Sequence, residues 1–275
     1  MSRANIGYQI GNMLDNEHLI AGTASGVGPS PKVWSSCPLL PIMLDPTKGF
    51  QFFTDCIKED YTTACGWTIT QHGTSGTLAD DPSVQGGIAT IDSGDTDSGD
   101  GPTIQIPSCQ VKPEAGTRIY FEARIAISQD SDQFVIGLCD DSITEIITSG
   151  TIVTNKDMAV FYRDNGTTDA KMSCHTCDGT NTNEQDDKIS DIDKTANTYE
   201  KYGIVIIGDG SVAGDHVEYY HQGELVAVST IDYVPDAVMC PTFECRSDGT
   251  NQPTMKIDWI RVAVYNSNDG SRLHA

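Results

Sequence analysis

The segment Thr117–Ile127 alternates apolar and polar side chains without a break. The apolar side chains occupy every second position: Ile119, Phe121, Ala123, Ile125 and Ile127. The positions between them carry Arg118, Tyr120, Glu122 and Arg124. Successive side chains of a strand point to opposite faces of a sheet, so this pattern predicts a strand with one face in the core.

Short β-rich runs bounded by turn residues continue along the chain. They predict strands at residues 50–53, 67–70, 87–91, 133–139, 158–162, 202–207, 237–245 and 255–265. Residues 216–229 predict a hairpin that turns at Gln222 and Gly223, because glycine accepts the positive φ of a tight turn. No segment has the apolar spacing of an amphipathic helix of three turns. The chain is therefore predicted to be all-β, as a sandwich or jelly roll.

Residues 1–48 differ in composition from the rest. Residues 21–31 are rich in Gly, Ser and Pro, and Pro38, Pro41 and Pro46 follow. Proline removes a backbone donor and disfavours both long helices and central strands. We therefore predict an extended N-terminal arm over residues 1–48 and a β-sandwich over 49–275. Two interpretations of the arm stay open: it lies on another subunit, or it is a disordered leader.

Charge excludes several classes of partner. The chain carries 17 Lys and Arg against 39 Asp and Glu, a net charge of −22. Nucleic acids and anionic membranes both attract basic faces, so we expect neither as a partner. The first residues lack the apolar core and cleavage site of a secretion signal, which predicts assembly in a cytoplasm and mostly reduced, buried thiols among the nine cysteines.

Two segments resemble the concanavalin A-like lectin/glucanase superfamily. Residues 116–125, GTRIYFEARI, are similar to an early strand of its laminarinase-type hydrolases. Residues 255–265, MKIDWIRVAVY, are similar to their final strand. The resemblance covers roughly residues 50–265 and implies a concanavalin A-like jelly-roll sandwich that follows the arm. Its motifs are structural, so they indicate a fold rather than an activity.

The resemblance also implies where a glycosidase would hold its carboxylates. These hydrolases share the pattern Glu-x-Asp-x-x-Glu, and retaining chemistry needs two carboxylates about 5–5.5 Å apart. The nearest spacing here is Asp140, Ser142 and Glu145, in which a serine replaces the middle carboxylate. A second partial match begins at Glu184 and Asp186 but lacks the last carboxylate. Since neither match keeps the set, we expect the protein not to be an enzyme.

A sugar site would combine an aromatic platform with planar polar groups. The candidates are Trp67, at the start of a predicted strand, and the polar stripe Tyr120, Glu122 and Arg124, which would line a concave face. Trp67 fits a core position equally well, and the simpler interpretation makes an ordinary ion pair of Glu122 and Arg124.

An acidic, glycine-rich loop over residues 92–101 is the candidate calcium site. Asp95, Asp97 and Asp100 offer carboxylate oxygens at a suitable spacing. The loop lacks the distal bidentate glutamate of an EF-hand, so a solvated surface loop is the favoured interpretation.

A C-x-x-C motif at Cys174 and Cys177 is the candidate zinc site. A closed site needs four ligands, and Cys240 with Cys245 would supply the other two at a loose spacing. Core thiols are the simpler interpretation, so no cofactor is expected.

The combination of an arm, an acidic sandwich and no catalytic set is similar to the accessory proteins of tailed-bacteriophage virions, which decorate or cement a capsid. This resemblance implies a non-enzymatic virion protein whose partners are the major capsid protein or other virion subunits. It also implies a homo-oligomer, expected to be a trimer, that is located in the virion and assembled in the host cytoplasm. The alternative is a glycan-binding or glycan-cleaving jelly-roll protein, such as a tail adhesin.

Overall fold

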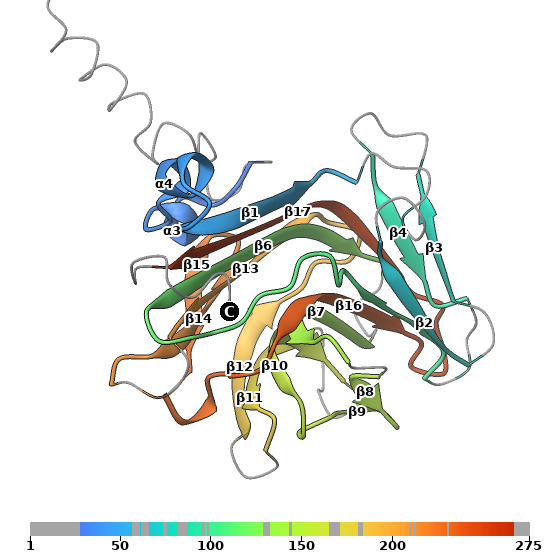
Figure 1. The fold of residues 1–275 in the computed structure, drawn as a ribbon. Helices are drawn as coiled ribbons and strands as arrows, with labels where there is room; N and C mark the ends of the chain where they lie inside the picture. Colours follow the sequence, from blue (N-terminus) through green and yellow to red (C-terminus); the bar gives the residue numbers. More distant parts are fainter. Residues whose placement is uncertain are drawn as a thin grey trace, which may run out of the picture.

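Two antiparallel β-sheets stack face to face in this protein (Figure 1). The computed structural model describes residues 28–56, 61, 66–73, 76–81, 87–94, 97, 99–128, 133–142, 145–164, 171–180, 184–208, 211, 213–229 and 231–266, with the side chains of 184–193 and 231 left aside. The predicted all-β, jelly-roll class is confirmed.

The upper layer in Figure 1, sheet A, has the strand order β15–β14–β13–β6–β17–β4–β3. Its strands are β15 (Glu224–Val228), β14 (His216–His221), β13 (Glu200–Ile207), β6 (Thr117–Ile127), β17 (Thr254–Asn266), β4 (Ala89–Asp92) and β3 (Thr77–Asp80). The long strand β17 pairs with β4 through its first half and with β1 (Gly49–Thr54) through its second half.

The lower layer, sheet B, has the strand order β12–β11–β10–β7–β16–β5–β2. Its strands are β12 (Glu184–Asp193), β11 (Lys171–Asp178), β10 (Asp157–Arg163), β7 (Gln133–Asp140), β16 (Met239–Arg246), β5 (Gly101–Gln105) and β2 (Thr68–His72). A small hairpin of β8 (Ile147–Thr148) and β9 (Thr151–Ile152) lies beyond this sheet, and a 3-10 turn, η1 (Ile231–Tyr233), contacts β11.

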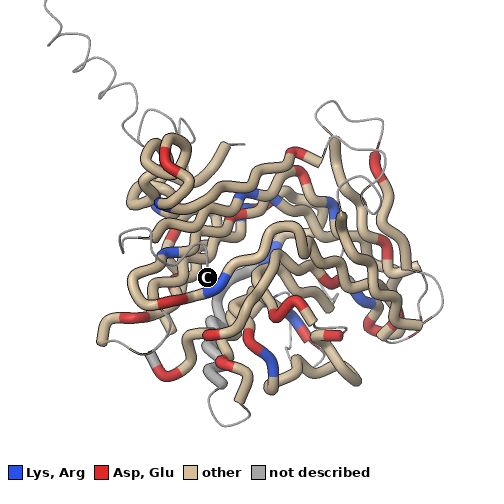
Figure 2. The backbone as a smooth tube through the Cα atoms, in the orientation of Figure 1, with Lys and Arg blue, Asp and Glu red and all other residues tan. Residues whose placement is uncertain are grey.

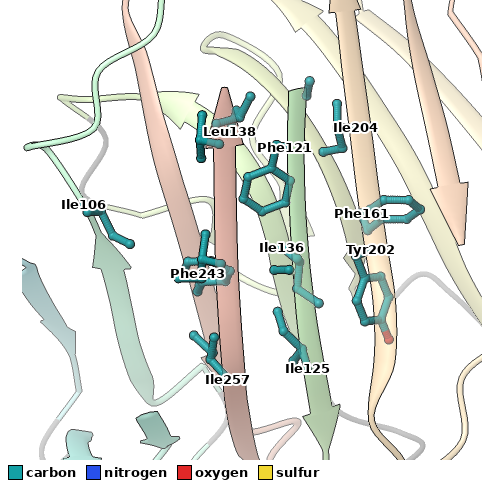
Figure 3. Packing of buried hydrophobic residues seen from close by; sticks show 14 of the residues in the cluster. Ile106, Phe121, Ile125, Ile136, Leu138, Phe161, Tyr202, Ile204, Phe243 and Ile257 are labelled. Atoms are coloured by element: carbon teal, nitrogen blue, oxygen red, sulfur yellow. The ribbon is translucent and has the colours of Figure 1, made fainter. Parts of the chain in front are cut away.

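Apolar side chains from the facing sides of both sheets form the main core (Figure 3). Phe121 of sheet A meets Phe243 of sheet B with ring centroids 6.3 Å apart. Phe161 lies between Tyr202 and Tyr219, edge-on to each at 5.4 Å. The five apolar residues of β6 that the alternation predicted to be inward all belong to this core.

Two further apolar clusters lie on the outer faces of the sandwich. One joins residues 33–42 to the outer face of sheet A, and the other joins residues 146–152 to the outer face of sheet B. Each sheet is therefore covered in part on both of its faces. In an ordinary two-layer sandwich the outer faces are exposed to solvent.

The prediction of an extended arm through residue 48 is wrong for its described part. Residues 31–34 and 39–44 form the short helices α3 (Pro31–Trp34) and α4 (Leu39–Leu44), which lie on sheet A of the same chain (Figure 1). Pro31 stands at the first position of α3, where its missing N–H costs nothing. Residues 1–27 lie outside the described residues. Neither described α-helix, of four and six residues, has the length of a membrane span.

Candidate functional site

Glu122 is the centre of the covered face of sheet A. Its side chain is fully buried and accepts hydrogen bonds from the backbone N–H of Ser30 at 3.0 Å and from the indole Nε1–H of Trp34 at 2.6 Å. The Lys201 ammonium, on the neighbouring strand, donates to the carbonyl of Gly28 at 3.1 Å. We call residues 28–44 the strap. We call the surface beneath it, formed by Tyr120, Glu122, Lys201, Gly203 and Arg261, the seat.

Aromatic and apolar contacts complete the seat. The ring of Trp34 stacks on Tyr120 at 5.9 Å and 27°, and the Arg261 guanidinium lies 5.4 Å from the Trp34 centroid. Val33 packs against Gly203, where an added Cβ would come within 2.8 Å of a Val33 methyl carbon. Trp34 and Val33 thus pack closely against the seat, which has a glycine where a larger residue would clash with the strap.

Burial dominates the electrostatics of the seat. It raises the pKa of Glu122, although the hydrogen bonds from Ser30 and Trp34 and the charge of Lys201 oppose the rise. Burial likewise lowers the pKa of Lys201 and of Arg261, and Glu122 opposes both shifts. Glu122 thus accepts two N–H groups and interacts with two cations in a place that water does not reach. If the strap were lost, no water would be there to replace these partners, so Glu122 holds the strap on the sheet.

A second buried glutamate holds the hairpin on sheet B. Glu244 accepts the backbone N–H groups of Ile146 at 3.0 Å and Ile147 at 2.9 Å, and it pairs with Arg246 at 2.9 Å. Thr103 donates its hydroxyl to the same carboxylate. Burial raises the pKa of Glu244, and the Arg246 charge opposes that rise.

The hairpin covers part of the outer face of sheet B. Apolar residues of β7, β10 and β11 pack there against Ile146, Ile147 and Ile152. The two hydrolase candidates serve local structure: Glu145 pairs with Arg246 at 2.8 Å, and Asp140 accepts the N–H and hydroxyl of Ser142 at 2.8 and 2.7 Å. Glu184 and Asp186 lie on β12, whose side chains are outside the description.

The predicted ligand stripe is divided by the structure. Tyr120 and Glu122 lie under the strap on the outer face of sheet A, which arches over sheet B, so the expected concave site is wrong for them (Figure 1). Arg124 pairs with Asp258 rather than with Glu122 and stacks 4.5 Å from the Tyr199 centroid. Tyr120, Glu122 and Arg124 alternate with the core positions of β6, as predicted. Their interaction partners, however, come from segments that are distant in the sequence.

Trp67 belongs to the main core, which corrects its proposed ligand role. Its side chain is buried and lies 4.8 Å from the ring of Tyr61. A residue just before β2 has its side chain directed between the sheets, so it offers no platform to a ligand.

A cavity of about 310 Å³ opens beside Arg124 on the outer face of sheet A. It is lined by Ile88, Ala126, Ser128, Asn197, Tyr199, Thr254 and Lys256. Asn197 has a positive φ of 56° and donates its side-chain amide to the Ser128 carbonyl at 3.0 Å, which shapes the rim. Sequence reasoning missed this site because its residues come from four segments that no motif connects.

Neither metal candidate assembles among the described residues, where no three potential ligands converge. Asp95 lies outside them, and the Asp100 N–H donates to the Asp97 carbonyl at 3.0 Å in a local turn. Cys174 and Cys177 are three positions apart on β11, so Cys174 faces the main core and Cys177 the outer cluster. Opposite faces of one strand cannot share a zinc ion.

Solved structures confirm the jelly-roll fold. The Emp47p carbohydrate recognition domain aligns with a TM-score of 0.51 at 11% identity, covering 81% of this chain and 98% of that chain. Peanut lectin, solved with the nonapeptide PVIWSSATG, gives 0.51 at 9% identity over 81% and 100% of the chains. A Lotus tetragonolobus seed lectin gives 0.50 at 12% identity over 80% and 100%. No protein-family model matches the chain, and neither does any curated protein sequence.

The fold is a lectin-like jelly roll. Identities of 9–12% carry no residue-level correspondence, so these neighbours establish architecture alone. The strap on sheet A and the hairpin on sheet B are defined by contacts within this chain, not by comparison with these neighbours.

Proposed function

We propose that this protein is a non-catalytic docking module of a larger particle, and that capsid decoration in a phage virion is the form this role takes. The observation that carries the proposal is an exposed apolar patch. Met43 and Leu44 of α4 and Phe53 of β1 are 62%, 74% and 55% exposed, and α4 contacts β1. We call these three residues the α4 patch. We propose that the three side chains form one interaction surface, since exposed apolar patches mark protein interaction sites.

The covered faces support a role without catalysis. Glu244 holds the hairpin on the outer face of sheet B, so this part of the face is covered by the chain itself. Glu145, the residue nearest in pattern to a catalytic acid, is paired with Arg246. We propose on these grounds that the protein does not hydrolyse glycans.

Charge indicates the kind of partner. Acidic residues outnumber basic ones by 22 and are spread over both layers of the sandwich (Figure 2). A basic rim around an apolar centre on the partner would complement the α4 patch and the negative net charge of this chain. Such a surface on a capsid subunit would also bring the two together faster.

The test is binding to assembled capsid shells prepared without this protein. The triple variant Met43→Ser, Leu44→Ser, Phe53→Ser should bind at least tenfold more weakly than the native chain. The control, Leu225→Ser with Val228→Ser, removes two apolar side chains of similar exposure (50% and 46%) from β15 and should bind normally. Equal binding by all three proteins, or no binding by the native chain, would refute the docking role.

Glycan binding is the second candidate, and the cavity beside Arg124 favours it. Tyr199 supplies a ring, while Ser128, Asn197 and Lys256 supply hydrogen-bonding groups around it. A glycan array followed by calorimetry tests this function. Tyr199→Ala should abolish any binding, whereas Tyr233→Ala, on η1, should leave it intact; binding that survives Tyr199→Ala would place the sugar elsewhere.

A further inference from the structure

The strap is a separable unit of the fold. Its buried residues form a cluster with Tyr120, Val205, Tyr220 and Ala263, all on the outer face of sheet A. The main core lies on the opposite face of the same sheet. Lifting the strap would therefore expose the seat while leaving the packing between the sheets unchanged.

A single turn joins the strap to the sheet. Asp45 accepts the N–H and hydroxyl of Thr47 at 2.9 and 2.6 Å, and the Lys48 N–H donates to the Asp45 carbonyl at 3.0 Å. With Pro46 between them, these contacts form a compact hinge. The end of the hinge is fixed to sheet A, since the Lys48 carbonyl accepts the N–H of Asn266 on β17 at 2.9 Å. Opening the turn before Lys48 would break its local bonds and redirect the strap away from its own sheet, while β1 keeps its place.

Exposed apolar side chains lie on both sides of this hinge. Met43 and Leu44 precede it, and Phe53 follows it on β1. In an exchanged pair of chains, two hinges come together about a two-fold axis and create an interface that the single chain does not have. Burial of the α4 patch there would favour the exchanged form.

We propose that two copies of this chain exchange straps, so that Trp34 and Ser30 of each copy bind Glu122 of the other. Every contact within the seat is kept in the exchanged dimer, because donor and acceptor are the same residues. Forming the dimer costs only the entropy of association, because the seat contacts are the same in both forms. New apolar contacts at the hinge would offset this cost. The inference goes beyond the docking role and does not need the particle. Because the exchanged dimer buries the α4 patch, exchange and docking through that patch are alternative uses of the same surface.

The contact between Lys32 of the strap and Glu224 of β15 provides a test. A Lys32→Cys chain is mixed with a Glu224→Cys chain, incubated at high concentration and oxidised. Exchange places one new thiol from each chain at the same contact, so non-reducing electrophoresis should show a cross-linked dimer. Each variant alone should give at least tenfold less, since the native cysteines of the described chain are buried.

The double variant Lys32→Cys, Glu224→Cys in one chain is the positive control for the geometry. If it forms an internal disulfide while the mixture gives no cross-linked dimer, exchange does not occur. Light scattering gives an independent readout: the native chain should double its mass of 29.6 kDa as concentration rises, and Met43→Ser with Leu44→Ser should lower this dimer fraction at least tenfold, because those exposed side chains become buried only in the exchanged dimer. A native chain that stays monomeric, or a dimer that this variant leaves unchanged, would overturn the proposal. Both readouts use the chain without shells, so failure here is distinct from failure of docking.

Discussion

The indole N–H of Trp34 lies 2.6 Å from a carboxylate oxygen of Glu122, 88 residues further along the chain. Both side chains are fully buried. This contact holds the proline-rich strap on the sheet. It also keeps solvent away from the Glu122 carboxylate, which the sequence pattern had indicated as a candidate ligand group. The consequences of this contact can be measured.

Trp34→Phe should destabilise the chain by about 1–3 kcal/mol, because it keeps a ring but leaves the buried carboxylate short of a donor. Chemical denaturation measures the change in the free energy of unfolding. In a Glu122→Gln background the same substitution should cost less, since the two residues interact directly. Equal costs in both backgrounds would show that the hydrogen bond contributes nothing to stability.

Cys37 should report the opening of the strap. Its thiol is buried, and burial raises its pKa to about 12, so it should react slowly with thiol reagents in the native chain. Trp34→Ala should accelerate the labelling of Cys37 at least tenfold. Cys109, whose pKa burial also raises to about 12, lies in the main core and serves as the control. Parallel acceleration of both thiols would indicate global unfolding instead.

Gly203→Ala should displace the strap. The new Cβ would lie 2.8 Å from a Val33 side-chain carbon, closer than packed atoms tolerate. We expect a loss of about 1–3 kcal/mol from overpacking. Val33→Ala removes the clashing atoms, so the double variant should lose less than the sum of the single losses. An additive result, measured by thermal or chemical unfolding, would mean that Val33 does not pack there.

Stability should rise as pH falls through the titration of the two buried glutamates. Burial raises the folded-state pKa of Glu122 and Glu244 above the usual 4.5, so the folded chain binds protons at a pH where the unfolded chain does not. Each glutamate therefore contributes stability that increases as pH decreases from its raised pKa toward 4.5. Denaturation across this window should show a smaller slope in Glu122→Gln. An unchanged slope would exclude Glu122 as a source.

Glu244→Ala should release the hairpin from sheet B. It removes the acceptor of the Ile146 and Ile147 amides and leaves the buried Arg246 with only the partly exposed Glu145 as a carboxylate partner, so we expect a loss of about 3–5 kcal/mol. Hydrogen exchange of those two amides should accelerate more than exchange within β6. Glu145→Ala, at a partly exposed partner of Arg246, should cost about 1 kcal/mol or less. Slow exchange at Ile146 in Glu244→Ala would show that Glu244 does not hold the hairpin.

Local patterns predicted most strands of the sandwich but missed others. The hairpin turn at Gln222 and Gly223 follows from their positive φ of 51° and 79°, and β6 begins and ends at the predicted residues. Two neighbouring strands of sheet B were missed, because β11 contains the C-x-x-C motif and β12 is an acidic run. Charged residues are common on an edge strand such as β12, where they discourage pairing with other chains.

The amino-acid sequence by itself determined the class of the fold and which side of β6 faces the core between the sheets, because both follow from a two-residue period that acts between neighbours in the chain. Only the tertiary structure decided what covers the other side. The partners of Glu122 come from residues 30 and 34, and those of Glu244 from residues 146 and 147. Contacts between segments about 90 residues apart depend on how the sheets bring those segments together, and no local pattern encodes that distance.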